Sequence, residues 1–360
     1  MRKADLSLYA LLVFVPIAAL LEYARPEAHT LIFFAACCGI VPLAGLMGRA
    51  TEQIADRAGE GIGGLLNATF GNAAELIIAI VALRAGQIDI VKASLTGSII
   101  GNVLLVLGAA FLAGGLRHKQ QEFNAISARA QAQMLLVSAV AMMVPALFHA
   151  LRPESAVVNE AAISFAIACL LMAVYALSLV FSLRTHRELF RGTQHEEPQD
   201  GHAEAAGSLP RAIGTLAVVT VFIAWMSEIM VGSVEEAAHN LGMSTVFVGV
   251  IIVATIGNAA EHSTAVLAAI RNRMDLSLSI AIGSSTQIAL FVTPLLVVLS
   301  LIVSPTPMDL VFTTGETFAV VMAAVLTVHT TGEGHSNWFT GVLLLALYVI
   351  LAVAFFHAPG

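Results

Sequence analysis

Two identical Asn-x-x-Glu arrangements occur 186 residues apart in this chain of 360 residues. The segments ATFGNAAE and ATIGNAAE, which end at Glu75 and Glu261, agree at seven of their eight positions. Because residues three apart share one face of a helix, Asn72 should lie beside Glu75, and Asn258 beside Glu261. A carboxylate next to an amide oxygen can hold a cation or a proton. The Gly before each Asn weakens the helix there, so backbone carbonyls can join the site.

More oxygen donors follow in the next apolar segment of each half, where Gly97-Ser98 corresponds to Gly283-Ser284 at the same offset. Hard oxygen donors without a Cys or His cluster favour Ca²⁺, Mn²⁺ or Mg²⁺ over Zn²⁺ or Cu⁺. Ca²⁺ fits best, because it accepts roughly six to eight flexible oxygens and dehydrates more easily than Mg²⁺. The candidate cation-binding and proton-exchanging residues are Glu75, Glu261, Asn72, Asn258, Ser98, Asn102, Ser284, Ser285 and Gln287, and the two glutamates are the expected metal ligands.

Composition places most of the chain in lipid. Hydrophobic residues make up 58% and charged residues 11%, whereas soluble proteins carry about 25% charged residues. This excludes a soluble enzyme, a disordered chain and a nucleic-acid binder. The chain also lacks His-Glu-x-x-His and Gly-x-Ser-x-Gly motifs, so no enzymatic activity and no cofactor are expected.

The elements that must position these residues are apolar runs of about 20 residues. They predict an all-α membrane protein with eleven transmembrane helices at 6–24, 29–48, 62–83, 93–116, 130–149, 157–183, 212–235, 246–270, 276–303, 308–328 and 337–356. The duplication divides the chain into an N-terminal anchor helix (1–28), a first five-helix repeat (29–183), a polar loop (184–210) and a second five-helix repeat (211–360). An odd number of helices per repeat inverts the second copy relative to the first.

The distribution of basic residues orients this map. With the N-terminus in the cytoplasm, 13 of the 17 Lys and Arg residues lie on the cytoplasmic side, as the positive-inside rule requires. The C-terminus is then on the opposite side. The loop 184–210 becomes a solvated cytoplasmic linker, with weak cation sensing by its acidic residues as the alternative. The membrane expected is a prokaryotic inner membrane, with a vacuolar membrane second, and oligomerisation is left open.

The map leaves no basic side chain inside the membrane to pair with Glu75 and Glu261. An unpaired carboxylate is costly there, so each must take up a proton or share a cation. Desolvation and a second carboxylate nearby favour the protonated form, whereas a divalent cation favours the charged form. Two protons or one divalent cation would both neutralise the pair, and a cation/proton antiporter alternates between those states.

Other ionisable residues could form a proton or cation entry pathway. Glu52 and Glu236 are related by the repeat and are interpreted either as guides for ions or as interfacial carboxylates that reach water. Glu228 lies deeper in its span, where it either faces a cavity and handles protons or cations or has no such role. Glu235 is placed at the outer mouth. His262 is either a proton relay or a packed polar neighbour of Glu261. Inside its span, Glu316 is interpreted as a protonated, structural hydrogen-bond donor, with its role otherwise open.

These motifs resemble a known family. The stretch GGLLNATFGNAAELI that ends at Ile77, followed by GSIIGN from Gly97, is similar to the first signature of the CAX-type Ca²⁺/H⁺ antiporters. The stretches GNAAEH from Gly257 and GSSTQIALFV from Gly283 resemble the second signature. The resemblance covers most of the chain. It implies eleven helices, exchange of cytosolic Ca²⁺ for protons, and a site formed by the glutamates matching Glu75 and Glu261.

The wider calcium/cation antiporter superfamily includes Na⁺/Ca²⁺ exchangers, which typically carry a further acidic residue in the stretch matching 284–287. This chain has SSTQ there, which favours protons as the counter-ion. The function predicted is secondary active transport by alternating access, with Ca²⁺, H⁺ and the lipid bilayer as partners. A Na⁺/Ca²⁺ exchanger or an exchanger of another divalent cation such as Mn²⁺ is the alternative. A cation channel is less favoured, because an inverted repeat with a broken helix in each half indicates alternating access.

Overall fold

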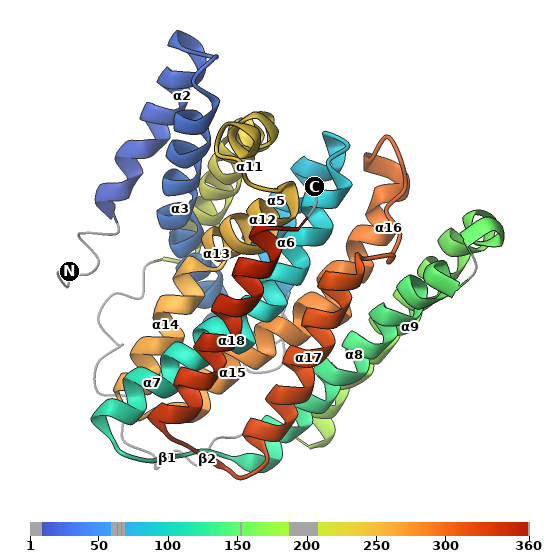
Figure 1. The fold of residues 1–360 in the computed structure, drawn as a ribbon. Coiled ribbons are helices and arrows are strands. Elements are labelled where there is room, and N and C mark those ends of the chain that lie inside the picture. The colour runs from blue at the N-terminus through green and yellow to red at the C-terminus, as the bar shows by residue number, and fades with distance from the viewer. Residues whose placement is uncertain are drawn as a thin grey trace.

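The computed structural model describes residues 9–58, 63, 66, 69–151, 153–186 and 208–358, almost all of them helical (Figure 1). The first half comprises η1 (Leu11–Val13), α2 (Phe14–Ala24), α3 (His29–Ala58), α5 (Ala73–Arg84), α6 (Ile88–Ile100), η2 (Gly101–Val106), α7 (Leu107–Arg117), β1 (Gln121–Glu122), α8 (Ala125–Leu151), α9 (Pro153–Val180) and η3 (Phe181–Thr185). Most of the polar linker 184–210 lies outside the described residues.

The second half begins with α11 (Leu209–Asn240). It continues with α12 (Thr245–Phe247), η4 (Val248–Val253), α13 (Ala254–Gly257), α14 (Ala259–Ile270), α15 (Met274–Gln287), η5 (Ile288–Val292), α16 (Thr293–Val303), α17 (Thr314–Thr331), β2 (His335–Ser336) and α18 (Trp338–Phe356). The π-helical segments η2 and η5 occupy matching places in the two halves, after α6 and after α15. The duplication is therefore visible in local backbone form as well as in sequence.

Seven of the described helical stretches are long and apolar enough to cross a membrane. An eighth is added if the stretches Thr245–Gly257 and Ala259–Ile270, which are bent relative to each other, count as one span. Each predicted span contains a described helix, although α2 is short. The structure thus bears out a helical membrane protein. The count of eleven, the inverted arrangement and the domain boundaries stay predictions.

Several predicted boundaries differ from the observed helix ends, and two of these differences have a clear cause. Helix α3 continues ten residues past position 48, to Ala58, because its last turns are polar but still favourable to helix. Helix α17 begins at Thr314 rather than 308, because Thr313 and Glu316 form a capping box that fixes its start. Residues 308–313 precede it without regular structure.

The helix breaks predicted at the Gly-Asn pairs are present. In the second half, α13 ends at Gly257 and α14 starts at Ala259 with a bend of 64° at Asn258. In the first half, Gly71 and Asn72 form a turn immediately before α5. Both asparagines therefore lie at the start of a new helix, each carrying its glutamate into the first turn.

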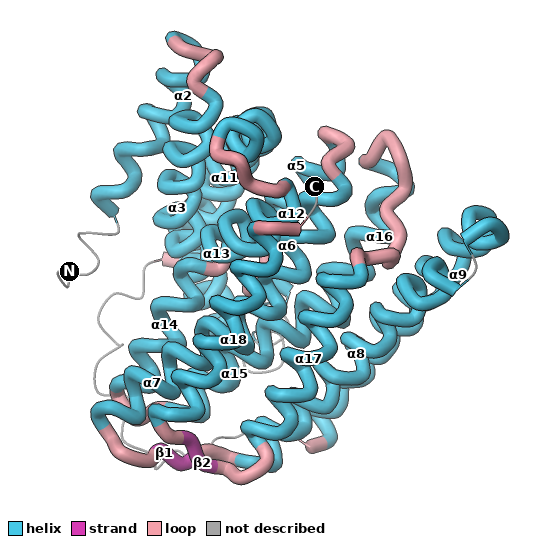
Figure 2. The backbone as a smooth tube through the Cα atoms, viewed as in Figure 1, coloured by secondary structure: helices cyan, strands magenta, loops and turns pink. Residues whose placement is uncertain are grey.

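The two halves pack into each other rather than side by side as separate domains. Helix α11 runs along α3, α6 packs against η4, and α18 packs against α7. Contacts at these crossings are close enough to need glycine: a Cβ on Gly97 would overlap the backbone of Val250, and one on Gly341 would overlap the backbone of α7. The antiparallel pair β1–β2 also joins the halves, at the end of the bundle opposite the α5–α6 turn (Figure 2).

Candidate cation-binding site

The two broken helices bring the acidic residues of the repeats together. Glu75 lies in the first turn of α5 and Glu261 in the first turn of α14, where the positive end of each helix dipole favours a negative charge. The two carboxylates are close enough to interact electrostatically. Glu75 also lies against Gly257, at the break of the other half, with its Cγ 3.5 Å from where a Cβ on that glycine would be.

The asparagines are held by hydrogen bonds that cross between the halves. Asn258 donates through Nδ2 to Ser98 Oγ of α6 at 2.9 Å. In the matching contact, Ser284 Oγ of α15 donates to Asn72 Oδ1 at 2.9 Å. Asn72 Nδ2 then donates to Gln287 Oε1 at 2.7 Å. The serine of each half thus positions the asparagine of the other, although the direction of donation differs.

Three oxygen atoms at this centre are enclosed without a hydrogen-bond partner among the described residues. They are Oε2 of Glu75, Oε2 of Glu261 and Oδ1 of Asn258. An unpartnered buried acceptor costs about 1–3 kcal/mol, and more when it is charged. Three such oxygens form a donor set suited to a hard cation or to protons. Among the described residues, no Lys or Arg forms an ion pair with either glutamate.

A small cavity opens beside Glu75, with room for about one water molecule. Ser98, Gly257 and Ser94 line it, and Val253 and Ile288 provide apolar walls. Ser94 was not among the sequence candidates. Its spacing of four residues from Ser98 on α6 was the signal that could have found it, because residues i and i+4 share a helix face.

The remaining predicted ligands lie at the edge of this centre. Asn102, on η2, contacts His262 through Oδ1 and Nε2 at 3.1 Å, so the histidine packs against an amide of the other half. Ser285 donates to the backbone carbonyls of Ala281 and Ile99, at 3.0 and 3.3 Å. Its hydroxyl hydrogen is therefore committed to the backbone rather than to the paired glutamates.

The acids assigned to an entry pathway are not part of the enclosed centre. Glu52 on α3 and Glu228, Glu235 and Glu236 on α11 are all exposed on the surface of the bundle. Cation guidance by these residues stays a prediction.

With this geometry in place, comparison with known proteins identifies the family. A family model described as sodium/calcium exchanger protein matches residues 28–184 and 211–357. The chain belongs to the sodium/calcium exchanger family. The two matched regions leave out the polar linker, and each contains one copy of the repeat.

Relatives similar to this chain along most of its length include a Ca²⁺/H⁺ antiporter of Synechocystis, 45% identical over 97% of this chain and 96% of the relative. The Ca²⁺/H⁺ antiporter ChaA of Bacillus subtilis is 44% identical over 90% of this chain and 92% of its own length. A vacuolar calcium ion transporter of Schizosaccharomyces pombe is 39% identical over 97% of this chain and 84% of its own.

Solved structures agree with the fold. Native YfkE has a TM-score of 0.83 at 38% identity and covers 98% of this chain and 100% of its own. An H⁺/Ca²⁺ exchanger named CAX has a TM-score of 0.72 at 16% identity, covering 99% of this chain and 89% of that chain, which is similarity of fold alone. The resemblance to CAX-type antiporters found in the sequence is confirmed.

Proposed function

We propose that this protein exchanges Ca²⁺ for protons across a membrane, at a site centred on Glu75 and Glu261. The observation that carries the proposal is the set of three enclosed, unpartnered oxygens, supplied by both halves of the chain. Relatives that cover nearly its whole length are named Ca²⁺/H⁺ antiporters, which supports the same substrates here.

The paired carboxylates account for coupling. One Ca²⁺ bound between Glu75 and Glu261 neutralises both charges, and at least two protons do the same. The empty pair carries an excess of negative charge, and a pair that holds Ca²⁺ and protons together carries an excess of positive charge. The site therefore exchanges one ligand for the other. We expect no resident cofactor, because Ca²⁺ and H⁺ bind this site as transported substrates.

The way the asparagines are held supports transport by alternating access. Ser98 anchors Asn258 and Ser284 anchors Asn72, each across the boundary between halves. Rocking or sliding of one half against the other changes the spacing between the two glutamates and the access to the cavity beside Glu75. We expect the side facing the cytosol to load Ca²⁺ and the opposite side to load protons.

Na⁺ is the alternative counter-ion, and Mn²⁺ an alternative cargo. The helix α15 carries Ser284, Ser285 and Gln287 beside the site and no carboxylate in the stretch 284–287. A further bound Na⁺ would lack the negative charge that compensates it, which supports protons.

The membrane and the orientation belong to the proposal as well. An excess of Lys and Arg on one side of the predicted map supports a cytoplasmic N-terminus and a C-terminus on the opposite side. A prokaryotic inner membrane is the first expectation and a vacuolar membrane the second. The relatives come from both bacteria and the vacuoles of eukaryotes.

The test is uptake of ⁴⁵Ca²⁺ into proteoliposomes with an imposed pH gradient. Glu75→Gln and Glu261→Gln should each lower the rate about 10²-fold or more, since each removes both a ligand charge and a proton carrier. Glu22→Gln, which changes an exposed carboxylate on α2 outside the site and the predicted entry pathway, serves as the matched control and should transport at a rate near that of the wild type. Uptake that ignores the pH gradient and follows a Na⁺ gradient would establish the alternative, and full activity in both site variants would remove the proposed site.

A further inference from the structure

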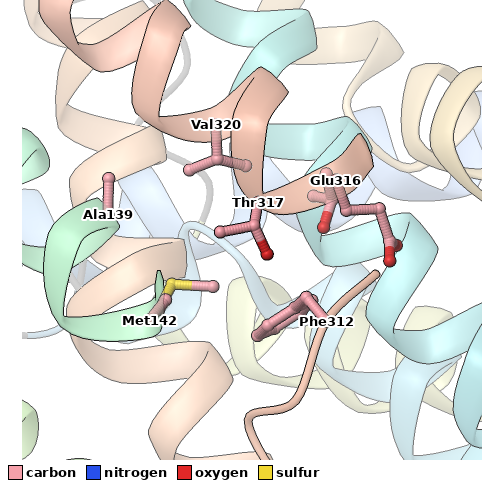
Figure 3. A pocket seen from close by; sticks show the side chains of 7 residues that line it. Ala139, Met142, Phe312, Glu316, Thr317 and Val320 are labelled. Atoms are coloured by element: carbon pink, nitrogen blue, oxygen red, sulfur yellow. The ribbon is translucent and has the colours of Figure 1, made fainter. Parts of the chain in front are cut away.

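A second enclosed polar cavity lies between α6, α8 and α17 (Figure 3). Thr96, Glu316 and Thr317 line it, together with apolar walls from Ala139, Met142 and Phe312, and it has room for about one water molecule. Thr96 is two residues before Ser98 on α6, and residues two apart point to nearly opposite sides of a helix. Helix α6 therefore separates this cavity from the paired glutamates.

Three polar atoms that line this cavity have no hydrogen-bond partner among the described residues. They are Oγ1 of Thr96, Oε1 of Glu316 and Oγ1 of Thr317. Thr96 is 0% and Glu316 2% exposed. Buried polar groups are normally satisfied by protein or by an ordered water with about two to four partners. One water has enough hydrogen-bonding capacity for three such atoms.

The other oxygen of Glu316 is already fixed. Glu316 Oε2 accepts from Thr313 N at 2.9 Å and from Thr313 Oγ1 at 2.7 Å, which completes the capping box of α17. This contact orients the carboxylate so that Oε1 is the oxygen left without a protein partner. The position of Glu316 is thus set by the helix start, independently of what the cavity holds.

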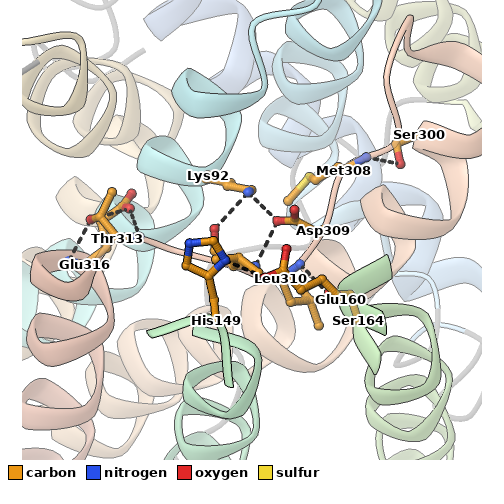
Figure 4. Close-up of polar contacts among 11 residues, drawn as sticks. Lys92, His149, Glu160, Ser164, Ser300, Met308, Asp309, Leu310, Thr313 and Glu316 are labelled. Carbon is orange, nitrogen blue, oxygen red and sulfur yellow. Dashed lines mark hydrogen bonds and ion pairs between the residues drawn. The ribbon is translucent and has the colours of Figure 1, made fainter. Parts of the chain in front are cut away.

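Two charged groups of α6 lie near Glu316. Lys92 and Asp89 of α6 are close enough to interact electrostatically with its carboxylate. The Lys92 ammonium donates to Asp309 at 2.5 Å and to the carbonyl of Val311 at 2.8 Å (Figure 4). Asp309 has a side chain that is 35% exposed, so this charged group reaches the surface.

The remaining neighbours favour water over a metal as the occupant. The α8 residues that line the cavity, Ala139 and Met142, are apolar, and His149, further along α8, is paired with Glu160 of α9. One carboxylate with an ammonium group nearby does not balance a divalent cation. A neutral water suits the two hydroxyls and the free carboxylate oxygen.

We propose that this cavity binds a water molecule that carries protons to and from Glu316, so that Glu316 is a proton-exchanging residue outside the paired-glutamate site. In the forward step the Glu316 carboxylic acid gives its proton to the water, which leaves a carboxylate and a hydronium ion. The hydronium ion then passes the proton outward, and the reverse step reloads the acid. Lys92 compensates the carboxylate. The inference rests on the proposed Ca²⁺/H⁺ exchange.

The decisive variant is Glu316→Gln. Glutamine can still complete a capping box with Thr313, so the start of α17 is kept while the proton carrier is lost. Two fluxes are compared in proteoliposomes: ⁴⁵Ca²⁺ uptake driven by a pH gradient, and exchange of ⁴⁵Ca²⁺ for unlabelled Ca²⁺ at equal pH, which moves no protons. We expect the first to fall about 10²-fold and the second to stay near the wild-type rate.

Equal losses in both fluxes, or no loss in either, would overturn the role of Glu316. Failure of the proposed function itself looks different, because the wild type would then show no uptake that depends on the pH gradient.

A second pair of variants covers the case in which Glu316→Gln does not accumulate. Thr317→Val keeps the shape of the side chain but removes one partner of the water, so pH-driven uptake should fall about fivefold with self-exchange unchanged. Thr330→Val is the matched control: it makes the same change on α17, at a threonine that donates to Leu326 O and does not line the cavity. An equal loss of pH-driven uptake in Thr330→Val and Thr317→Val would show that helix stability, not the water, sets the rate.

Discussion

The two repeat-related asparagines should contribute unequally to Ca²⁺ binding, although their sequence context is nearly identical. The amide of Asn72 uses both its atoms, donating to Gln287 and accepting from Ser284. Asn258 donates to Ser98 and to the carbonyl of Ala254, and its Oδ1 has no partner among the described residues. Only Asn258 therefore offers a cation an uncommitted carbonyl oxygen.

The magnitude follows from what each truncation removes. Asn258→Ala deletes an oxygen that faces charge, an interaction of about 1.5–3 kcal/mol, which corresponds to a dissociation constant about 10- to 150-fold weaker. Asn72→Ala deletes an oxygen already shared with a hydroxyl, an interaction of about 0.5–1.5 kcal/mol, or about 2- to 10-fold. Both asparagines are buried, so both variants lose some stability.

Equilibrium dialysis of the purified protein against ⁴⁵Ca²⁺ measures the two dissociation constants directly. Thermal unfolding of the same samples checks that each variant is folded, and the comparison uses only preparations that melt cooperatively. An affinity loss for Asn72→Ala that equals or exceeds the loss for Asn258→Ala would refute the reasoning, because it would mean that the repeat symmetry, and not the hydrogen-bond pattern, decides which amide binds the ion.

Three further predictions concern neighbouring features. His262→Gln should retain uptake driven by a pH gradient, because glutamine can still donate to Asn102, whereas loss of a proton relay would slow it about 10²-fold; that slower rate would make the histidine a relay. Gly341→Ala should lower the free energy of unfolding by about 1–3 kcal/mol, because its methyl group meets the backbone of α7. Gly214→Ala is the control and should not destabilise the protein, because the space around Gly214 is open. Equal melting temperatures of the two variants would contradict this prediction. Lys92→Met should lower the free energy of unfolding by about 1–2 kcal/mol, because it leaves Asp309 without its ion pair. The same substitution should lower this free energy less in a protein that already carries Asp309→Asn. Strictly additive losses in the double variant would show that the pair contributes nothing.

Much of the fold could be predicted, because hydropathy and the duplication can both be read directly from the residue types along the chain. Apolar runs located a helix in each predicted span, and the Gly-Asn pairs located the breaks at Asn72 and Asn258. Helix ends were less accessible. Hydropathy reports where lipid ends rather than where a helix ends, so it missed the polar last turns of α3. The Thr-x-x-Glu pattern at Thr313 was legible as a capping box and would have corrected the start of α17.

The site was predictable in its residue types but not in its pairings. Repeat symmetry suggests equivalent roles for Ser98 and Ser284, yet one hydroxyl accepts and the other donates. Such directions depend on which rotamers the packed halves allow, and packing is not a property of either copy alone. The same limit applies to Glu316, whose neighbour Lys92 lies more than 200 positions away in the chain and half-buried at the start of α6.

The crossed contacts of the asparagines also bear on how such a chain could arise and be assembled. A half-length polypeptide would present its asparagine without the serine that positions it, and its glutamate without a counterpart. An ancestral single-copy protein of this design would have had to pair with a second molecule. Joining two copies in one gene fixes their stoichiometry at one to one, and leaves each copy free to diverge, as the hydrogen bonds of Asn72 and Asn258 have done.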